Sequence, residues 1–329
     1  MCLQALDIGL IQALQNTGGW LKPVMEFFTA LGYPQAYMAI IAVVYWSLDR
    51  KLGLKMAIYL PLASSINSIL KFAIHAPRPY WVSTEILAIH SPNGFGMPSG
   101  HAQASTVWLL ASCFLRKKWF WTVAILLTLC IGLSRAYLGV HFPTQVIAGW
   151  VAGITVLICF IRLERVISSW LKSHHLYRQL LFMLGTTFLI ILAGAIILLI
   201  TRNWDLPADW IWNASSIQSL DTNLLRAYSM ASVAGNAGSF LGVSIGAVLM
   251  GKAGGFTVNG KWWVRLLRIV LGLACMFLLY AGLQTIAPGE ANLSAYAIWR
   301  FMGFYVISFS AVYILPILFV RLKLLKSDQ

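Results

Sequence analysis

The sequence predicts an all-α protein, a polytopic bundle of about nine membrane-spanning helices. Of the 329 residues, 59% are hydrophobic and only 10% are charged, and the mean hydropathy is +0.77. This composition leaves too little polar surface to coat a soluble globule of that length. The apolar residues also gather in long runs, and a helix needs about 20 residues to cross a bilayer. These observations predict a helical integral membrane protein.

The N-terminal residues 1–19 are expected to form an amphipathic segment of their own. They lack the basic region and the cleavage site of a signal peptide. Asp7 interrupts an amphipathic stretch between Leu3 and Leu14. The sequence leaves open whether this stretch lies in the membrane interface or forms a short buried helix.

Nine apolar runs follow, each long enough to cross, or nearly cross, a bilayer. They cover about residues 32–48, 54–73, 102–115, 119–140, 144–161, 180–200, 227–250, 264–286 and 298–320. The third run is short. The polar stretch 162–178 separates five front helices from four back helices. We therefore expect a core at residues 20–165 and a four-helix membrane region at residues 166–329.

The basic residues give the expected orientation. The net charge of +14 could suggest a nucleic-acid partner, but the positive residues lie in small clusters between apolar runs, as topology signals do, so no nucleic acid is expected. When loops are assigned alternately to two faces, 17 of the 24 basic residues fall on one face, which predicts that this face and the C-terminus are cytoplasmic. Those residues are Arg50, Lys51, Lys55, Arg116, Lys117, Lys118, Arg162, Arg165, Lys172, Arg178, Lys252, Lys261, Arg265, Arg268, Arg321, Lys323 and Lys326.

Three short motifs fall on the opposite, outer face. They are Lys71 with Arg78-Pro79, then Pro98-Ser99-Gly100-His101, then Ser134-Arg135 with His141. Basic side chains are costly inside a bilayer, so their recurrence at the ends of apolar segments predicts a functional site with an anionic partner. Phosphate is the candidate anion.

The residue types suit a phosphate monoester, a tetrahedral dianion. Guanidinium groups such as Arg78 and Arg135 grip its oxygens in bidentate fashion, and Lys71 adds a point charge. Ser99 and Gly100 precede a helix, where backbone N–H groups and the small glycine favour a close anion. Two histidines remain, His101 and His141, and metal-free phosphoryl transfer to water can use one as nucleophile and one as acid.

The three motifs resemble the signature of the type 2 phosphatidic acid phosphatase (PAP2) superfamily, which also includes glucose-6-phosphatase and vanadium haloperoxidases. The resemblance covers residues 71–145 and implies a PAP2-like phosphatase core. It assigns the nucleophile that forms a phosphohistidine to His141 and the acid that protonates the leaving oxygen to His101. It assigns phosphate binding to five further residues of the motifs, Lys71, Arg78, Ser99, Gly100 and Arg135.

One position departs from the family pattern. The third motif usually has an aspartate four residues after the nucleophile, and here that residue is Gln145. The segment from His141 to Val146 resembles the glucose-6-phosphatase branch instead. A glutamine carbonyl can accept a hydrogen bond from imidazole and select the same tautomer as a carboxylate. We therefore expect Gln145 to orient His141.

The sequence favours a membrane phosphatase with an outward-facing site that acts on a lipid phosphate or diphosphate. A sugar-phosphate phosphatase and a phosphate-binding transporter without catalysis are the alternatives; a haloperoxidase would need bound vanadate.

No His/Asp/Glu cluster accompanies the motifs, so no metal and no cofactor are expected. The expected location is the inner or plasma membrane in a bacterium and the endoplasmic reticulum in a eukaryote. Membrane lipids and a phosphorylated lipid or small molecule are the expected partners, and the sequence gives no oligomeric state.

Two sets of aromatic and imidazole side chains lie outside the signature. His75 and His90 are in the loop of the expected site, where structural or solvated roles are favoured. Tryptophans of the back half are expected to form a belt at the membrane interface. They are Trp204, Trp210, Trp212, Trp262 and Trp263.

Overall fold

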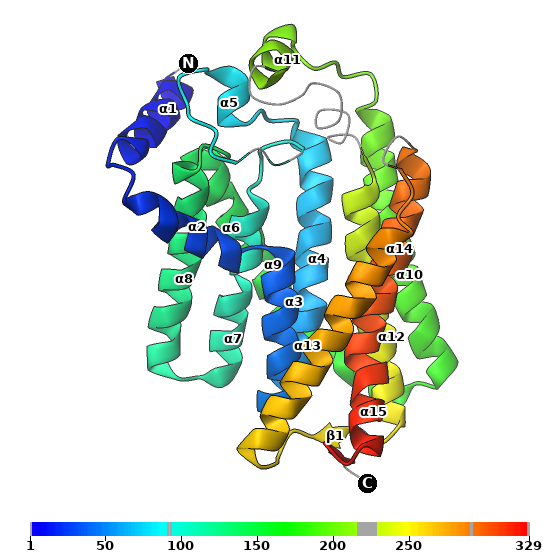
Figure 1. The fold of residues 1–329 in the computed structure, drawn as a ribbon. Helices are drawn as coiled ribbons and strands as arrows, with labels where there is room; N and C mark the ends of the chain where they lie inside the picture. The colour runs from blue at the N-terminus through cyan, green and yellow to red at the C-terminus, as the bar shows by residue number, and fades with distance from the viewer. Residues whose placement is uncertain (1, 91, 93, 216–228, 290–291, 328–329) are drawn as a thin grey trace. The chain divides into compact units, whose positions relative to one another are not determined.

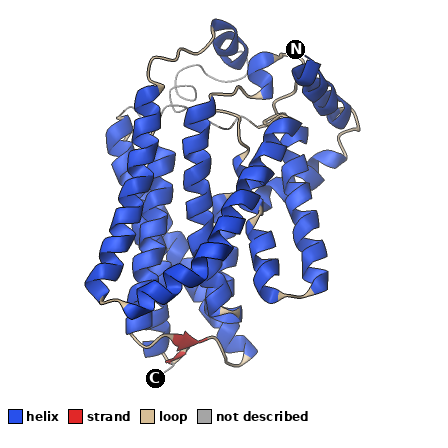
Figure 2. Cartoon of the chain, turned by 180° about the vertical axis from the view of Figure 1, so that it is seen from behind, coloured by secondary structure: helices blue, strands red, loops and turns tan. Residues whose placement is uncertain are grey.

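The chain folds almost entirely into helices (Figures 1 and 2). The structure, a computed structural model, describes residues 2–90, 92, 94–215, 229–289 and 292–327. The helices are α1 (Cys2–Gln15), α2 (Leu21–Leu31), α3 (Pro34–Val43), the π-helix η1 (Val44–Leu48), α4 (Arg50–Ile74), α5 (Pro79–Val82), α6 (Gly100–Ser105), α7 (Val107–Leu115), α8 (Lys118–Tyr137), α9 (Pro143–Ser173), α10 (Leu176–Ile200), α11 (Ala208–Ser215), α12 (Ala231–Lys252), α13 (Trp262–Thr285), α14 (Leu293–Phe309), the π-helix η3 (Ser310–Ile314) and α15 (Leu315–Arg321). Two short strands, β1 (Phe256–Thr257) and β2 (Lys326–Ser327), pair antiparallel.

The described helices confirm the predicted fold class, a polytopic helical membrane protein. Seven of them are long and apolar enough to cross a membrane, or up to eight if the bent pair that begins with α2 counts as one span. The predicted third run instead forms α6 and α7, which are separated at Thr106 and are each too short to cross alone. The start of the predicted seventh run, residues 227 and 228, lies outside the described residues. The count of nine spans stays a prediction.

The chain forms two compact units that are interleaved in sequence. Unit 1 comprises residues 1–34, 66–159 and 193–229, and unit 2 comprises residues 35–65, 160–192 and 230–329. The long helices α4, α9 and α10 each contribute residues to both units. All residues of the three motifs lie in unit 1. The predicted division at residues 19 and 165 stays a prediction.

Close helix packing in unit 1 places the second motif in contact with α9. A Cβ atom at Gly149 would lie 2.5 Å from the carbonyl oxygen of Ser99, and one at Gly153 would lie 2.6 Å from the Thr106 hydroxyl. Both distances are too short for a side chain, so these two glycines of α9 allow α6 to approach. Small residues four positions apart commonly permit such contacts between membrane helices. The arrangement brings Ser99 beside the first turn of α9, which carries Gln145.

Hydrogen bonds connect the N-terminal helix α1 to the first turn of α9. Its Asp7 is only 4% exposed and accepts hydrogen bonds from the backbone N–H and the hydroxyl of Thr144, in the first turn of α9. A carboxylate at that point satisfies an orphan donor and complements the helix dipole. Gln15 donates to the backbone carbonyls of Leu87 and Tyr137. The predicted amphipathic segment therefore packs as a short helix in unit 1.

Unit 2 is held together by small residues and by aromatic donors. A Cβ atom at Gly238 of α12 would lie 2.1 Å from the Phe301 carbonyl oxygen of α14, so the two helix backbones are in close contact. The π-helix η3 leaves carbonyl groups without their usual helical partners. The Tyr45 hydroxyl donates to the carbonyl of Val312, and the Trp46 indole donates to that of Ala311.

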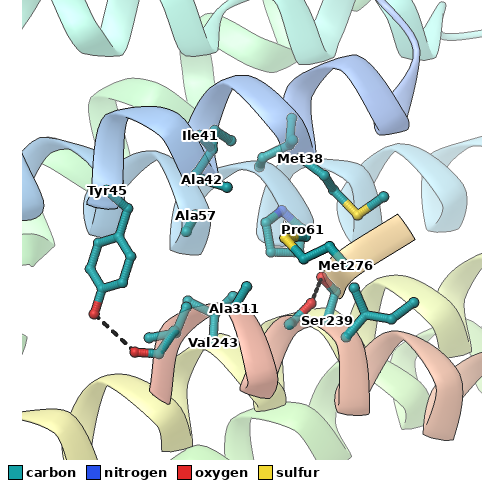
Figure 3. Close-up of a pocket in the computed structure, with 14 residues that line it drawn as sticks. Met38, Ile41, Ala42, Tyr45, Ala57, Pro61, Ser239, Val243, Met276 and Ala311 are labelled. Atoms are coloured by element: carbon teal, nitrogen blue, oxygen red, sulfur yellow. Dashed lines mark hydrogen bonds between the residues drawn. The ribbon is translucent and has the colours of Figure 1, made fainter. Parts of the chain in front are cut away.

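A cavity of about 70 Å³ lies inside unit 2 (Figure 3). Its lining is mainly apolar, with Met38, Ile41 and Val243 among its residues. The hydroxyl groups of Ser239 and Ser308 lie 2.7 Å apart and bond each other. Its polar groups therefore have partners within the protein.

Candidate active site

The third motif forms the turn between α8 and α9. The carbonyl of Arg135, in the last turn of α8, accepts hydrogen bonds from the backbone N–H groups of Val140 and His141, at 3.2 and 3.3 Å. Gly139 has a φ of 70°, and a Cβ atom there would lie 2.4 Å from the Leu87 carbonyl oxygen. Only glycine suits this position. The turn fixes His141 immediately before α9.

Gln145 fixes the tautomer of the His141 imidazole. Its Oε1 accepts from the backbone N–H of Phe142 at 3.2 Å, and its Nε2 donates to the carbonyl of Pro77 at 2.7 Å. A backbone N–H only donates and a carbonyl only accepts, so these two partners determine the orientation of the amide. The same Oε1 lies 3.2 Å from Nδ1 of His141, which must therefore carry the proton. The lone pair of His141 is then on Nε2.

The surroundings of Gln145 link all three motifs. Its backbone carbonyl accepts from the N–H of Ser99 at 3.0 Å, and its side chain reaches Pro77 in the first motif. A Cβ atom at Gly96 would lie 2.6 Å from both terminal atoms of the Gln145 amide, so Gly96 leaves the space that the amide occupies. The Ser99 N–H is thus committed within the protein. Among the polar groups of Ser99, the hydroxyl is the one that can reach a ligand.

Arg78 and Lys71 are held by neighbouring carbonyl groups of the loop after α5. Nε of Arg78 donates to the carbonyl of Gly94 at 2.7 Å, and Nζ of Lys71 donates to the carbonyl of Phe95 at 2.6 Å. A terminal nitrogen of Arg78 also donates to the carbonyl of Val140 at 2.9 Å and lies 3.4 Å from Nε2 of His141. Arg78 is 2% exposed. The first motif thus directly adjoins the candidate nucleophile.

Within the three motifs, three buried polar atoms have no hydrogen-bond partner among the described residues. They are Nε of Arg135, the hydroxyl of Ser99 and Nε2 of His101. Arg135 is 2% exposed, and one of its terminal nitrogens donates to the Thr29 hydroxyl. An unsatisfied buried donor costs about 1–3 kcal/mol, so atoms of this kind call for a functional explanation.

The imidazole of His101 occupies space that is left open by Gly32, at the C-terminal end of α2. A Cβ atom at Gly32 would lie 2.5 Å from Cδ2 of His101. The ring of Tyr33 meets the His101 ring edge to face, with centroids 5.1 Å apart. Contacts of this type fix the plane of the imidazole. His101 is therefore held from its side, while its Nε2 has no described partner.

The loop of the second motif is held by Asn67 of α4. Its amide nitrogen donates to the carbonyl of Pro98 at 3.2 Å and to the side-chain oxygen of Gln103 at 2.8 Å. A Cβ atom at Gly100 would lie 3.2 Å from the Asn67 side-chain oxygen, so glycine gives this loop its close fit. Asn67 thus fixes the position of the segment that carries Ser99 and His101.

The electric field of the site favours a neutral His141. Burial, followed by the positive charges of Arg78, Lys71 and Arg135 and by His101, holds the pKa of the His141 imidazole well below its usual value. A neutral imidazole at ordinary pH is the form that can act as a nucleophile. The described hydrogen-bond partners of Lys71 and Arg135 are neutral oxygens. A buried guanidinium and a half-buried ammonium with neutral partners favour an anionic ligand.

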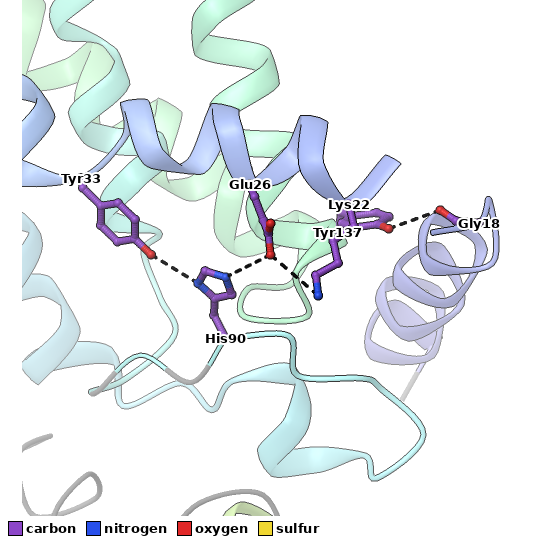
Figure 4. Close-up of polar contacts among 6 residues, drawn as sticks. All are labelled: Gly18, Lys22, Glu26, Tyr33, His90 and Tyr137. Carbon is purple, nitrogen blue, oxygen red and sulfur yellow. Dashed lines mark hydrogen bonds and ion pairs between the residues drawn. The ribbon is translucent and has the colours of Figure 1, made fainter. Parts of the chain in front are cut away.

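The other histidines of unit 1 lie around this group. His90 is near Tyr33 and Glu26 (Figure 4), with its Nδ1 3.3 Å from the Tyr33 hydroxyl and its Nε2 3.9 Å from Glu26. Burial and the charge of Arg135 lower the pKa of His90, while Glu26 opposes this effect. His75 is buried between the rings of Phe95 and Trp204. His75 and His90 thus lie beside residues of the site, although they are outside the motifs.

The structure thus brings the eight sequence-predicted site residues to one end of unit 1. Sequence reasoning did not find Thr29, Asn67 or Gly96, which position them. Asn67 carried a weak signal because it is a polar residue in the apolar part of a membrane helix. Thr29 and Gly96 carried none that distinguishes them from many other small residues.

Comparison with known families identifies the chain. A model described as "PAP2 superfamily" matches residues 52–168, and a model described as "PAP2 superfamily phosphatase, transmembrane extension" matches residues 234–327. The chain belongs to the PAP2 superfamily. It therefore combines a PAP2 domain, which contains all three motifs, with the transmembrane extension.

The relatives of this PAP2 protein include phosphatases of two substrate classes. It is 27% identical to an undecaprenyl-diphosphatase of Sulfolobus acidocaldarius over 44% of this chain and 71% of the relative. It is 28% identical to glucose-6-phosphatase 2 of Mus musculus over 61% of this chain and 67% of the relative. These relatives indicate that the protein is a phosphoric ester hydrolase of PAP2 type. A crystal structure of a transmembrane PAP2 type phosphatidylglycerolphosphate phosphatase from Bacillus subtilis matches with a TM-score of 0.44 and 25% identity, over 50% of this chain and 88% of that chain.

Proposed function

We propose that this membrane phosphatase hydrolyses a phosphate monoester or diphosphate through a covalent phosphohistidine at His141. The observation that carries the proposal is the His141 imidazole, whose tautomer Gln145 sets and which adjoins Arg78. The Nε2 lone pair attacks phosphorus as the bond from phosphorus to the leaving oxygen breaks. Water then attacks the phosphohistidine, and inorganic phosphate leaves with the free imidazole restored.

His101 is the proposed proton donor. In the first step a proton passes from Nε2 of His101 to the leaving oxygen, which avoids release of an unstable alkoxide. In the second step His101 takes a proton from the attacking water. Support comes from its buried Nε2, which has no hydrogen-bond partner among the described residues. Attacking and leaving groups must lie on opposite sides of phosphorus, so the proposal assigns the two roles to two different imidazoles.

The remaining motif residues are proposed to bind the phosphoryl oxygens. Lys71, Arg78 and Arg135 supply positive charge, and the Ser99 hydroxyl supplies a further hydrogen bond. Such groups stabilise charge that develops in the transition state, most strongly where water is excluded. Gly100 is proposed to act through the second-motif loop, which fits closely against Asn67 because this residue has no side chain.

A lipid phosphate or diphosphate is the leading substrate class, because a membrane protein can take such a substrate directly from the bilayer. The similarity to the undecaprenyl-diphosphatase supports this class. A sugar phosphate is the second candidate. Gln145 in place of the usual aspartate and the similarity to glucose-6-phosphatase 2 favour it.

Phosphate release by the purified protein tests both candidates. The panel contains lipid phosphates, isoprenoid diphosphates and sugar phosphates, and the His141→Ala variant serves as the blank for each. We expect the highest kcat/KM for a lipid substrate. A higher value for a sugar phosphate would replace the first candidate by the second, and no release above the blank from any compound would contradict the proposed function.

The active site is proposed to face outward, away from the cytoplasm. Leu87 is 65% exposed in the loop beside the site, and Lys117 is exposed in the turn between α7 and α8. In a variant without native cysteines, Leu87→Cys should react with an impermeant maleimide added outside the cell, or in the lumen of the endoplasmic reticulum, and Lys117→Cys should not. The reverse labelling pattern would overturn the orientation.

A further inference from the structure

Residues 201–215, here called the cap, pack on the loops of the active site although they follow in the sequence after α10. The cap contains α11, which lies against α5 (Figure 1). Its Trp204 and Trp210 are partly buried in a cluster with the rings of Tyr80, Trp81 and Phe95. This differs from the expectation of a membrane-interface belt, which the exposed Trp212, Trp262 and Trp263 still fit. The arrangement raises the question of what the two partly buried tryptophans, Trp204 and Trp210, support.

Trp204 supports the loop segment that holds the phosphate-binding cations. Its ring lies 5.9 Å from the Phe95 ring and 4.7 Å from the His75 ring, between centroids, and those two rings lie 4.8 Å apart. The carbonyl of Phe95 is the acceptor for Nζ of Lys71 at 2.6 Å. A displacement of the Phe95 ring would therefore move the carbonyl that holds Lys71.

Trp210 and Asn213 support α5, which begins immediately after Arg78. The Trp210 ring lies 6.2 Å from the Trp81 ring, and the Asn213 side chain donates to the carbonyl of Trp81 at 3.0 Å. Trp81 is in α5 and is 2% exposed. Arg78 is the residue at the N-terminal boundary of this helix. The position of α5 therefore determines the position of the Arg78 backbone, from which the guanidinium side chain extends.

We propose that the cap is a positioning element for the phosphate-binding groups, with Trp204 acting through Phe95 on Lys71. The inference rests on the proposed function, in which Lys71 and Arg78 bind the phosphoryl oxygens. His141 is held separately, by Gln145 and by the turn after α8. The cap therefore governs the binding of phosphate more than the reactivity of the nucleophile.

Trp204→Ala tests the proposal, with Trp212→Ala as its matched control. Trp212 is in the same cap and is 74% exposed, so its removal deletes the same amount of side chain without touching Phe95. Each protein is assayed for KM and kcat with the best substrate of the panel, and for orthovanadate affinity by the ligand-induced shift of the thermal midpoint. Orthovanadate adopts the five-coordinate geometry of the transferring phosphoryl group.

The expected result is a rise of about 10- to 100-fold in KM and in the orthovanadate dissociation constant for Trp204→Ala, because small displacements of positioning groups have effects of this size. We expect kcat to fall as well, because the same groups stabilise charge in the transition state, so the rise in KM and the loss of orthovanadate affinity are the changes that identify the positioning role. Trp204→Phe, which keeps an aromatic ring against Phe95 and His75, should recover most of the affinity, and Trp212→Ala should match the parent.

A purely structural role would give a different pattern. It would lower the thermal midpoint and the active fraction, so that kcat would fall while KM and orthovanadate affinity stayed at parent values, and that result would overturn the proposal. Equal effects of Trp204→Ala and Trp212→Ala would also overturn it. If the parent itself neither releases phosphate nor binds orthovanadate, the proposed function fails. If the parent does both and Trp204→Ala equals it, only the cap proposal fails.

A double-mutant cycle tests whether Trp204 acts through Lys71. In a Lys71→Ala background, Trp204→Ala should weaken orthovanadate binding much less than it does in the parent, because the cation that it positions is already gone. The thermal-shift measurement does not require turnover, so it remains usable in that background. Additive effects of the two substitutions would show that Trp204 does not act through Lys71.

Discussion

The two units bury arginine side chains in different surroundings. In unit 2, Arg268 is 0% exposed, and its two terminal nitrogens donate to the carbonyls of Trp46 and Val258 at 2.9 and 3.0 Å. In unit 1, Arg78 and Arg135 are 2% exposed and share one site with a lysine and two imidazoles. Burial of a guanidinium is therefore common to a structural link and to the candidate active site. The gathering of several cations around imidazoles distinguishes the site.

The hydroxyl groups of the two units differ in whether they have hydrogen-bond partners. In the unit 2 cavity, Ser239 and Ser308 bond each other at 2.7 Å, so an incoming phosphate would have to break an existing hydrogen bond. In unit 1, the hydroxyl of Ser99 is fully buried and has no hydrogen-bond partner among the described residues. Unsatisfied donors beside cations favour an anion, whereas satisfied hydroxyls in an apolar lining do not.

The largest expected effect is at the two histidines. His141→Ala should reduce turnover by on the order of 10⁶-fold, as the loss of a covalent nucleophile does elsewhere. His101→Ala should still form an acid-labile phosphoenzyme, but only with substrates whose leaving group needs no proton, such as a nitrophenyl phosphate. Labelling with radioactive phosphate followed by acid treatment measures this. Labelled protein in His141→Ala would contradict the assignment of the nucleophile.

A smaller effect should separate the buried arginines. Arg135→Lys keeps the charge but loses the planar fork, and we expect kcat/KM to fall by about 10²-fold, the cost of losing one transition-state donor. Arg268→Met should leave kcat/KM unchanged and destabilise the fold by about 1–3 kcal/mol, because two buried carbonyls lose their donors. Kinetics and thermal midpoints in detergent measure both. A catalytic defect in Arg268→Met that exceeds the defect in Arg135→Lys would remove the distinction between the units.

The sequence could predict which residues the structure gathers at the candidate site because each motif is local. Pro98 to His101 are consecutive, and Arg135 and His141 are six positions apart, so short-range spacing carried the information. The helical fold class followed from composition in the same way. These features depend on residue type and local spacing, and both can be read without knowledge of the tertiary structure.

The supporting contacts could not be predicted because their partners are mostly backbone atoms. The carbonyls of Gly94 and Phe95 hold Arg78 and Lys71, and a carbonyl has no signature in a sequence. The N–H of Ser99, expected at the phosphate, is instead bonded to the carbonyl of Gln145. These contacts join residues that are not neighbours in the sequence, so local spacing does not reveal them.

The tryptophans of the cap show a related difficulty. Trp204 and Trp212 are both tryptophans in the same short segment, yet only Trp204 packs in the aromatic cluster of the site loop. Composition predicts an interface belt for both. Only the fold distinguishes them, because it places one side chain against residues more than a hundred positions earlier.

Gln145 should have an intermediate effect. Gln145→Leu removes the acceptor for Nδ1–H of His141 and the donor to Pro77, and we expect kcat to fall by about 10- to 100-fold, a typical cost of losing an orienting partner. Gln145→Asp should stay active, since its carboxylate can still accept from Nδ1–H, and its acidic limb should move to higher pH because a negative charge raises the imidazole pKa. A leucine variant with parental kcat, together with an aspartate variant whose pH profile overlays the parent, would remove Gln145 from the catalytic group.

The smallest expected effect is a shift of the pH profile when one cation is removed. Burial, Arg78, Lys71 and Arg135 lower the pKa of His141, so the neutral nucleophile persists to a lower pH than an ordinary histidine would allow. Lys71→Met takes away one of these charges, which raises the pKa of His141. The acidic limb of kcat/KM should then lie at higher pH than in the parent, even where the maximal kcat/KM of the variant is lower.

The control for this shift is Lys22→Met. The Lys22 side chain is 52% exposed and lies 3.9 Å from Glu26 on α2, where solvent screens its charge. Its removal should leave the acidic limb in place. A limb that moves to lower pH in Lys71→Met, or that moves equally in both variants, would mean that Lys71 does not lie beside the titrating nucleophile. A shift in Lys71→Met alone would tie the cation cluster of unit 1 to the reactivity of His141, a link that the solitary Arg268 of unit 2 does not have.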